Sequence, residues 1–303
     1  MAMKKFAFTF ILAMVVFGCG SGGSVQTVSS PWIEEGWIQN SLTSTCSIVV
    51  NGQYRIFGLF GPPGISYVNS GDGRTFSTPI ETGIKSNGDV FQRNPSVIKL
   101  TNNQFMMIYE VVDENDISRF HRATSTDGSA FTDQVGPLTN GAVMEASVEA
   151  NNFISVPDMI MVDDKIYIYY VGNKSLNRIF YATSTDNGVT WVKGGQISID
   201  GINLTDKIVD PDVIVLPNGE YRLFFAHSKA SQRFGEQGIK AATSSNGINF
   251  IAEESYVIPS EEGHLNLDPD VIELIDQVGA YRMYFGRGSK GANEFNLYSA
   301  LSN

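Results

Sequence analysis

The feature that most constrains the fold is a short motif that recurs along the chain, in which a proline is followed by a polar residue and apolar residues typical of a β-strand. Four copies are Asn94-Pro95-Ser96-Val97-Ile98, Val156-Pro157-Asp158-Met159-Ile160, Asp210-Pro211-Asp212-Val213-Ile214 and Asp268-Pro269-Asp270-Val271-Ile272. A degenerate fifth copy is Thr45-Cys46-Ser47-Ile48-Val49, which we align through Ser47 so that Cys46 takes the proline position. The copies are about 49 to 62 residues apart, the period of four-stranded repeat units. We therefore predict an all-β fold, a five-bladed β-propeller.

Each repeat continues with an alternating strand and then a third strand that runs into a polar turn. The residues from Lys165 to Tyr170 alternate as a half-buried strand does. An arginine recurs at one position of this second strand (Arg55, Arg222 and Arg282), so we expect it to have a repeated structural partner. The turn from Ser184 to Trp191 resembles the Asp-box of sialidases, which is a structural hairpin, so Asp186 is not expected to be catalytic.

The last repeat stops at Asn303, just where its polar turn should form. Its missing fourth strand matches the other end of the chain, because Trp32-Ile33-Glu34-Glu35-Gly36 reads like Trp191-Val192-Lys193-Gly194-Gly195. We predict that the N-terminal strand completes the last blade, which removes two exposed strand edges. Residues 31–303 would then form a single propeller domain.

The first 30 residues are predicted to lie outside this domain. Lys4 and Lys5 precede an apolar run that ends just before Cys19, and Gly and Ser follow. This arrangement resembles a bacterial lipoprotein signal, which implies a signal peptide over residues 1–18, lipidation of Cys19 and a flexible tether over residues 19–30. An ordinary secretory peptide is the alternative. The resemblance implies a membrane-anchored protein of the bacterial cell envelope, either periplasmic or surface-exposed, and leaves the choice of membrane open.

The composition is that of a globular chain, not a disordered one, with 42% hydrophobic and 17% charged residues. A formal net charge of −11 argues against a nucleic-acid partner, because phosphate binding needs a basic face. An acidic surface is compatible with a neutral carbohydrate ligand, although it also serves plain solubility. We expect a monomer. Only two cysteines are present, so lipidation of Cys19 would leave Cys46 unpaired, as a buried and inert thiol.

In a propeller the innermost strands line the central channel. The motif would therefore place carboxylates near the axis from three consecutive blades, with a second carboxylate two residues earlier in two of them: Asp158, Asp212 and Asp270, preceded by Asp210 and Asp268. Clustered carboxylates raise one another's pKa, which is how general acids arise. The alternative is that each Asp only caps a backbone N–H of a neighbouring strand.

The five repeats with Asp-Pro and Pro-Asp strands resemble the arabinanase/β-xylosidase and invertase superfamily of glycoside hydrolases, and Arg93-Asn94-Pro95 resembles the related mannoside phosphorylases. The resemblance implies an Asp before Pro as the base, an Asp after Pro as the residue that tunes it, and a Glu as the acid. By position, Asp210 or Asp268 matches the base, and the tuning motif is matched by Asp158, Asp212 and Asp270.

The departures from that pattern concern the acid and the first blade. No repeat carries the Glu-Gly-Pro that usually bears the acid, and the first repeat has no carboxylate. Glu145 and Glu149, which precede the third blade, could substitute for that acid. Substrate contacts are expected from Arg93 and Asn94, and from two residues that follow second strands, His227 and Arg287.

No histidine spacing suggests a zinc site, and no cofactor-binding motif is present, although a ring of carboxylates could hold Ca²⁺. Two hypotheses remain. The first is a glycoside hydrolase of neutral oligosaccharides, which predicts two channel carboxylates about 5 to 9.5 Å apart beside an open pocket. The second is a non-catalytic propeller that binds glycan or protein, which predicts carboxylates that are satisfied by arginine or backbone.

Overall fold

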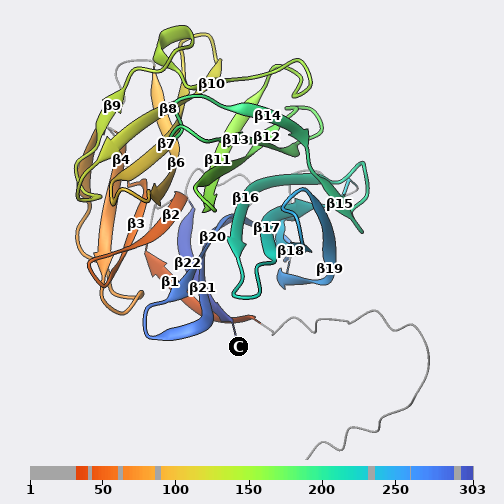
Figure 1. Cartoon of the computed structure of the whole chain (residues 1–303). Coiled ribbons are helices and arrows are strands. Elements are labelled where there is room, and N and C mark those ends of the chain that lie inside the picture. The colour runs from red at the N-terminus through yellow and green to blue at the C-terminus, as the bar shows by residue number, and fades with distance from the viewer. Residues whose placement is uncertain are drawn as a thin grey trace, which may run out of the picture.

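The computed structural model of the chain describes residues 32–39, 43–60, 64–85, 90–230, 236–259, 261–289 and 295–302. Over these residues the chain is all-β, apart from the single 3₁₀ turn η1 (Thr139–Gly141), and five sheets surround a central axis (Figure 1). The predicted five-bladed propeller is therefore confirmed. Cys19 and the expected signal and tether lie outside the described residues. In the part of the chain that the structure describes, no helix is long and apolar enough to cross a membrane.

The blades follow one another along the chain, and in each the first strand is the innermost. Blade 1 contains β2 (Thr43–Val50), β3 (Gln53–Leu59), β4 (Gly64–Ser70) and β5 (Ile80–Lys85). Blade 2 contains β6 (Phe91–Lys99), β7 (Phe105–Val112) and β8 (Ser118–Ser125), with β9 (Thr132–Gln134) and β10 (Met144–Glu145) both paired with β8. Blade 3 contains β11 (Ile154–Val162), β12 (Lys165–Gly172), β13 (Arg178–Ser184) and β14 (Val192–Gln196). Blade 4 contains β16 (Lys207–Val215), β17 (Tyr221–Ser228), β18 (Gly238–Ser244) and β19 (Asn249–Ile258), with β15 (Ser198–Asp200) parallel to β19. Blade 5 contains β20 (His264–Leu274), β21 (Gln277–Ser289), β22 (Asn296–Ser302) and β1 (Trp32–Gln39).

The N-terminal strand completes blade 5, as predicted. Strand β1 pairs antiparallel with β22, so the first and the last described strands lie side by side at the rim (Figure 1). Arg282 on β21 reaches across β22 to Glu35 on β1, with Nε 2.9 Å from Oε2. This ion pair is largely shielded from water. It therefore joins β1 to β21 in addition to the strand pairing that closes the ring.

The polar turns after the third strands of blades 1 to 4 share a pattern of internal hydrogen bonds. In blade 3 the carboxylate of Asp186 accepts the backbone N–H groups of Val189 and Thr190, and the Gly188 N–H donates to Ser184 Oγ. Asp72, Asp127 and Asn246 take the place of Asp186 in blades 1, 2 and 4. Such bonds favour the ionised carboxylate, and they hold the pKa of Asp72 well below its usual range.

The repeated arginines hold these turns or the outer strands in place. Arg55 donates to the Gly128 carbonyl in the turn of blade 2, and Arg282 donates to the Asp72 carbonyl in the turn of blade 1. Arg222 forms an ion pair with Glu253 inside its own blade. The expected repeated partner is therefore found for Arg55 and Arg282, whereas Arg222 has a partner of a different kind.

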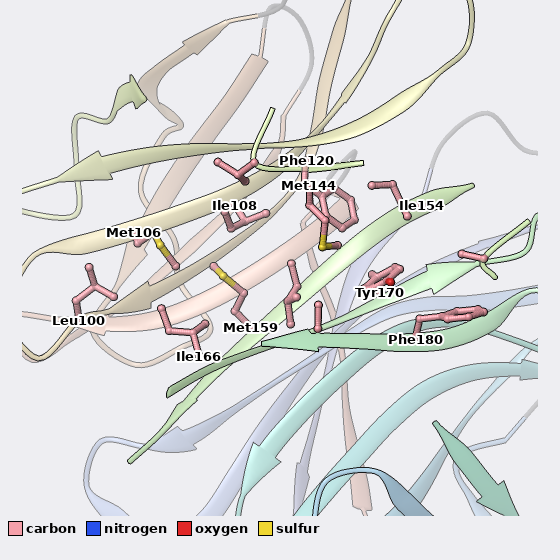
Figure 2. Packing of buried hydrophobic residues seen from close by; sticks show 14 residues of the cluster. Leu100, Met106, Ile108, Phe120, Met144, Ile154, Met159, Ile166, Tyr170 and Phe180 are labelled. Atoms are coloured by element: carbon pink, nitrogen blue, oxygen red, sulfur yellow. The ribbon is translucent and has the colours of Figure 1, made fainter. Parts of the chain in front are cut away.

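Apolar side chains fill the wedge between neighbouring blades. Figure 2 shows the cluster between blades 2 and 3, in which Met106, Ile108 and Phe120 pack against Met159 and Tyr170. Strands with large β-branched and aromatic side chains on both faces pack in this way, because each sheet is covered on each side by another blade. This packing fixes each inner strand relative to the next around the axis, and the innermost strands contact one another in cyclic order.

Candidate functional site

The repeated proline motif forms a bulge at the start of every inner strand. Pairing with the second strand skips two residues there, for example between Ser155 and Asp158 in blade 3. In four of the five blades the second skipped residue is a proline, which has no N–H to donate to the ladder. The first skipped residue has a positive φ in all five blades, from 48° to 55°: Ser44, Asn94, Val156, Asp210 and Asp268. Val156 is β-branched, so its φ of 48° is strained.

The pairing register corrects the alignment of the first repeat. Asp158 pairs with Tyr169, and the equivalent pair in blade 1 is Cys46 with Phe57. Cys46 therefore occupies the position of the polar residue that follows the proline, and Thr45 occupies that of the proline itself. The alignment through Ser47 is thus wrong by one residue. It failed because Thr45 carries no proline signal, whereas Ser47 coincidentally matches Ser96.

The five residues at this position form a closed ring of hydrogen bonds around the axis, which we call the deep ring. Each side chain accepts the backbone N–H of the residue that follows its counterpart in the next blade. The donors and acceptors are Val97 to Cys46 Sγ (3.1 Å), Met159 to Ser96 Oγ (2.9 Å), Val213 to Asp158 Oδ2 (2.8 Å), Val271 to Asp212 Oδ2 (3.2 Å) and Ser47 to Asp270 Oδ1 (2.9 Å). Since a thiol and a hydroxyl make the same bond, the ring itself does not require carboxylates.

The three deep-ring carboxyls nevertheless have strongly perturbed electrostatics. Burial raises the pKa of Asp158 to about 7 and that of Asp270 to about 6, and burial together with the charges of the other two raises the pKa of Asp212 well above its usual value. Burial likewise raises the pKa of the Cys46 thiol. The Oδ2 of Asp270 is buried and has no hydrogen-bond partner among the described residues. The ring therefore retains protons near neutral pH.

The residues with positive φ form a second ring one step closer to the channel mouth, by which we mean the end where the inner strands begin. In this mouth ring, the Asp268 N–H donates to Asp210 Oδ2 at 3.3 Å, and the Ser44 N–H donates to Asp268 Oδ2 at 3.0 Å. Burial raises the pKa of both carboxyls, and the charge of Asp268 raises that of Asp210 further. Two carboxyls of neighbouring blades thus compete for protons beside the mouth.

The two rings and the residues between them line a cavity of about 30 Å³ on the axis. A single water needs roughly 10 to 15 Å³, whereas pockets for organic ligands measure about 300 to 1,000 Å³. The cavity has room for water and none for a sugar ring. A carbohydrate could therefore approach these carboxyls only from the mouth.

Arg93 and Asn94 share a buried hydrogen-bond partner that was not expected from the sequence. Glu110 on β7 is fully buried and accepts from Arg93 Nη2 at 2.9 Å and from Asn94 Nδ2 at 2.6 Å. The available signal was a lone acidic residue within the apolar strand Phe105–Val112. A buried charge needs partners, and such a residue therefore marks a polar cluster.

Glu145 lies on β10 at the outer side of blade 2. Its Oε1 is 3.2 Å from Nε of Arg119, which also forms an ion pair with Asp113. Glu145 is not among the residues that line the axial cavity. The position is that of a rim ion pair.

His227 is buried at the end of β17 with both ring nitrogens bonded. Nε2 lies 3.1 Å from Asp206 Oδ2, and Nδ1 lies 2.6 Å from the hydroxyl of Tyr256. Burial lowers the pKa of His227, so its ring is mainly neutral at pH 7. Asp206, which precedes β16, was not anticipated from the sequence. The cluster holds the chain entering blade 4.

Arg287 has its donors occupied at the closure of blade 5. Its Nη atoms form two bonds of 2.9 and 3.0 Å with Glu34 on β1, and its Nε donates to Asn266 Oδ1 at 2.7 Å. This bidentate pair helps to hold the N-terminal strand, so the placement is that of a structural tie.

A second pocket, with a volume of about 380 Å³, lies off the axis between blades 3 and 4. Buried Arg178, Ile197 and Ile208 form part of its lining, and Gln196 and the largely exposed segment from Ser198 to Leu204 form the rest. Over the described residues, no group of three or more His, Cys, Asp or Glu side chains is arranged to hold a metal ion.

No protein-family model and no curated protein matches the sequence. Solved structures do match the fold. A thermostable family-43 glycoside hydrolase is 15% identical, with a TM-score of 0.66, over 85% of this chain and 88% of that chain. An endo-1,4-beta-xylanase from Bacteroides thetaiotaomicron is 14% identical, with a TM-score of 0.63, over 88% and 91%. An N-acetylgalactosamine deacetylase from F. plautii is 12% identical, with a TM-score of 0.66, over 90% and 95%. At these identities the likeness concerns the fold, and this fold carries more than one chemistry.

Proposed function

We propose that the protein is a glycoside hydrolase of neutral oligosaccharides, with Asp210 and Asp268 at the channel mouth as its acid and base. The observation that carries this proposal is the coupling of the two carboxyls. They lie on neighbouring blades, the N–H of Asp268 bonds the carboxylate of Asp210, and burial raises the pKa of both. Hydrolysis of a glycosidic bond uses a pair of carboxyls of which one is protonated and the other ionised. The shared fold with a family-43 glycoside hydrolase supports the same assignment.

The two roles follow from the local charges. The pKa of Asp210 is raised by burial and by the charge of Asp268, so Asp210 is the carboxyl that keeps its proton and gives it to the leaving oxygen. Asp268 has the Ser44 N–H, which favours its ionised form, so it acts on water or on the sugar itself. The distance between the two carboxyls decides whether Asp268 activates a water molecule, which inverts the sugar configuration, or attacks the sugar itself, which retains it.

The deep-ring carboxyls take no part in this scheme. Asp158, Asp212 and Asp270 bond the backbone of the next blade and border a cavity of about 30 Å³. We assign them to blade closure, in place of the tuning role that the sequence resemblance implies.

A non-catalytic propeller that binds glycan is the second candidate. It is favoured by one observation, which is that each mouth carboxyl already accepts a backbone N–H, as expected for capping groups. In this case a sugar would bind at the same mouth without being cleaved.

Hydrolysis of an aryl glycoside panel, combined with calorimetry on unmodified oligosaccharides, separates the two candidates. Asp210→Asn and Asp268→Asn each lower turnover by about 100-fold or more if the pair is catalytic. Asp212→Asn is the matched control, because it makes the same change one ring deeper and is expected to keep turnover within about threefold of the original. Binding without turnover supports the second candidate. Unchanged turnover in Asp210→Asn contradicts the catalytic assignment.

We further propose that the chain is anchored in the bacterial cell envelope through a lipid on Cys19, and that the turns around Asp186 are of the sialidase Asp-box type. The support for the anchor is the sequence pattern alone, an apolar run that ends just before Cys19. Metabolic labelling with a radioactive fatty acid tests it. The full-length chain should carry label, and Cys19→Ser should be unlabelled and released from membranes. Equal labelling of both chains would show that Cys19 is not the acceptor.

A further inference from the structure

We infer that Glu110 determines the charge preference of the channel mouth, because it fixes Arg93 and Asn94 and cancels the charge of Arg93, so that the mouth takes uncharged sugars and disfavours carboxylated ones. This inference rests on the proposed carbohydrate activity. It assigns to Glu110 a positioning role that the sequence pattern did not indicate.

Five donors surround the Glu110 carboxylate. Oε1 accepts from Arg93 Nη2 at 2.9 Å and from Ser118 Oγ at 2.6 Å. Oε2 accepts from Asn94 Nδ2 at 2.6 Å, from Ser155 Oγ at 2.7 Å and from the Val156 N–H at 3.3 Å. The side chain is fully buried, so these bonds are not exchanged with water, and the groups that make them are held in one geometry.

Glu110 also replaces a mouth-ring side chain at one joint of the propeller. Asp210 and Asp268 accept the N–H of the next mouth-ring residue, and at the joint between blades 2 and 3 the N–H of Val156 is accepted by Glu110 instead. Glu110 reaches this place from the second strand. Asn94 is thereby left as an amide beside the channel, and Arg93 is left with 42% of its side chain exposed.

The net charge of this arrangement decides what it can bind. Arg93 and Glu110 together are neutral, whereas Asp210 and Asp268 line the same cavity as Asn94. The exposed part of the guanidinium can donate hydrogen bonds to sugar hydroxyls in a fixed direction. A sugar carboxylate would meet the ionised carboxylate of Asp268 without a compensating positive charge, and that repulsion lowers its affinity.

The test compares two oligosaccharides of the same length, one neutral and one in which a single sugar is replaced by its uronic acid. The original protein should bind the neutral one by calorimetry at least about 10-fold more tightly. Glu110→Gln keeps the size and removes the charge, so the ratio should fall by at least about threefold. Arg93→Met removes the positive charge instead, so its ratio should rise.

A merely structural role for Glu110 would weaken both ligands equally and leave the ratio unchanged in Glu110→Gln, which would overturn the inference. Ratios that move in the same direction in the two variants would overturn it as well. If Glu110→Gln does not fold, as judged by its thermal melt, the expected rise in Arg93→Met decides alone. Failure of the original protein to bind either oligosaccharide would refute the proposed function, and the inference with it, whereas tight neutral binding with an unchanged ratio refutes the inference only.

Discussion

The deep ring predicts that this protein loses stability as the pH rises through the neutral range. Asp158 has a pKa of about 7 in the fold, against 3.8 for the unperturbed group. A carboxyl whose pKa is raised by folding contributes its full stability below the unfolded pKa, and that contribution is lost as the pH rises to the folded pKa. Each pH unit between the two values costs about 1.4 kcal/mol of unfolding free energy per retained proton.

Asp158→Asn isolates this effect, because its amide oxygen can still accept the Val213 N–H but the side chain no longer ionises. Two pH units, from pH 5 to pH 7, correspond to about 3 kcal/mol for an isolated group. Asp212 and Asp270 share the protons, so we expect about 2 kcal/mol. The free energy of unfolding of Asp158→Asn, relative to the original protein, should rise by that amount between pH 5 and pH 7.5.

Urea unfolding at these two pH values provides the measurement. Burial lowers the pKa of His121 and His227, which stabilises the fold as the pH rises, but both proteins carry these histidines and their contribution cancels in the difference. Asp186→Asn is the control, since the pKa of Asp186 is lowered and its titration in the fold lies below this range. A difference between Asp158→Asn and the original protein that is the same at both pH values would refute the reasoning.

Three further changes test other parts of the structure by urea unfolding. Val156→Asn places at a positive φ a residue that tolerates it, so the free energy of unfolding should rise by about 1 kcal/mol, and a fall of that size would argue against strain. Arg282→Met leaves Glu35 with the more distant Arg74 and with Ser299 as partners and should cost about 2 kcal/mol, whereas Lys174→Met, in an exposed pair, should cost less than about 0.5 kcal/mol; equal costs would show that the closure pair contributes little. Cys46→Asp adds a fourth carboxyl to the deep ring and should destabilise the protein more at pH 8 than at pH 5, and a pH-independent cost would contradict the coupling between ring members.

The architecture could be predicted because each repeat has residues that mark where its strands begin and end. The prolines of blades 2 to 5 mark the bulge at the start of each inner strand, and the truncated last repeat pointed to closure by residues 32–36. Blade 1 lacks the proline, and so the alignment slipped by one residue at Cys46. Over so short a stretch, the apolar pattern of the first inner strand fits two registers that differ by one residue. The pairing of Cys46 with Phe57 in the structure decides between them.

The site was harder to predict because its key contacts join blades that are distant in the sequence. The sequence placed the five aspartates together, but their bonds to the next blade, such as Val213 N–H to Asp158, depend on how the blades pack. Glu110 was missed because it lies inside an apolar strand, and its partner Ser155 follows 45 residues later. His227 was expected at the mouth, and the structure shows it enclosed by Asp206 and Tyr256.

The most direct test of the account is a crystal structure of Asp210→Asn with a bound neutral oligosaccharide, since the variant should bind sugar without cleaving it. The account predicts a sugar ring at the channel mouth, within hydrogen-bond distance of Asp268 and Arg93, and no sugar atom in the axial cavity of about 30 Å³. An oligosaccharide bound only in the pocket of about 380 Å³ between blades 3 and 4, away from Asp268, would contradict it.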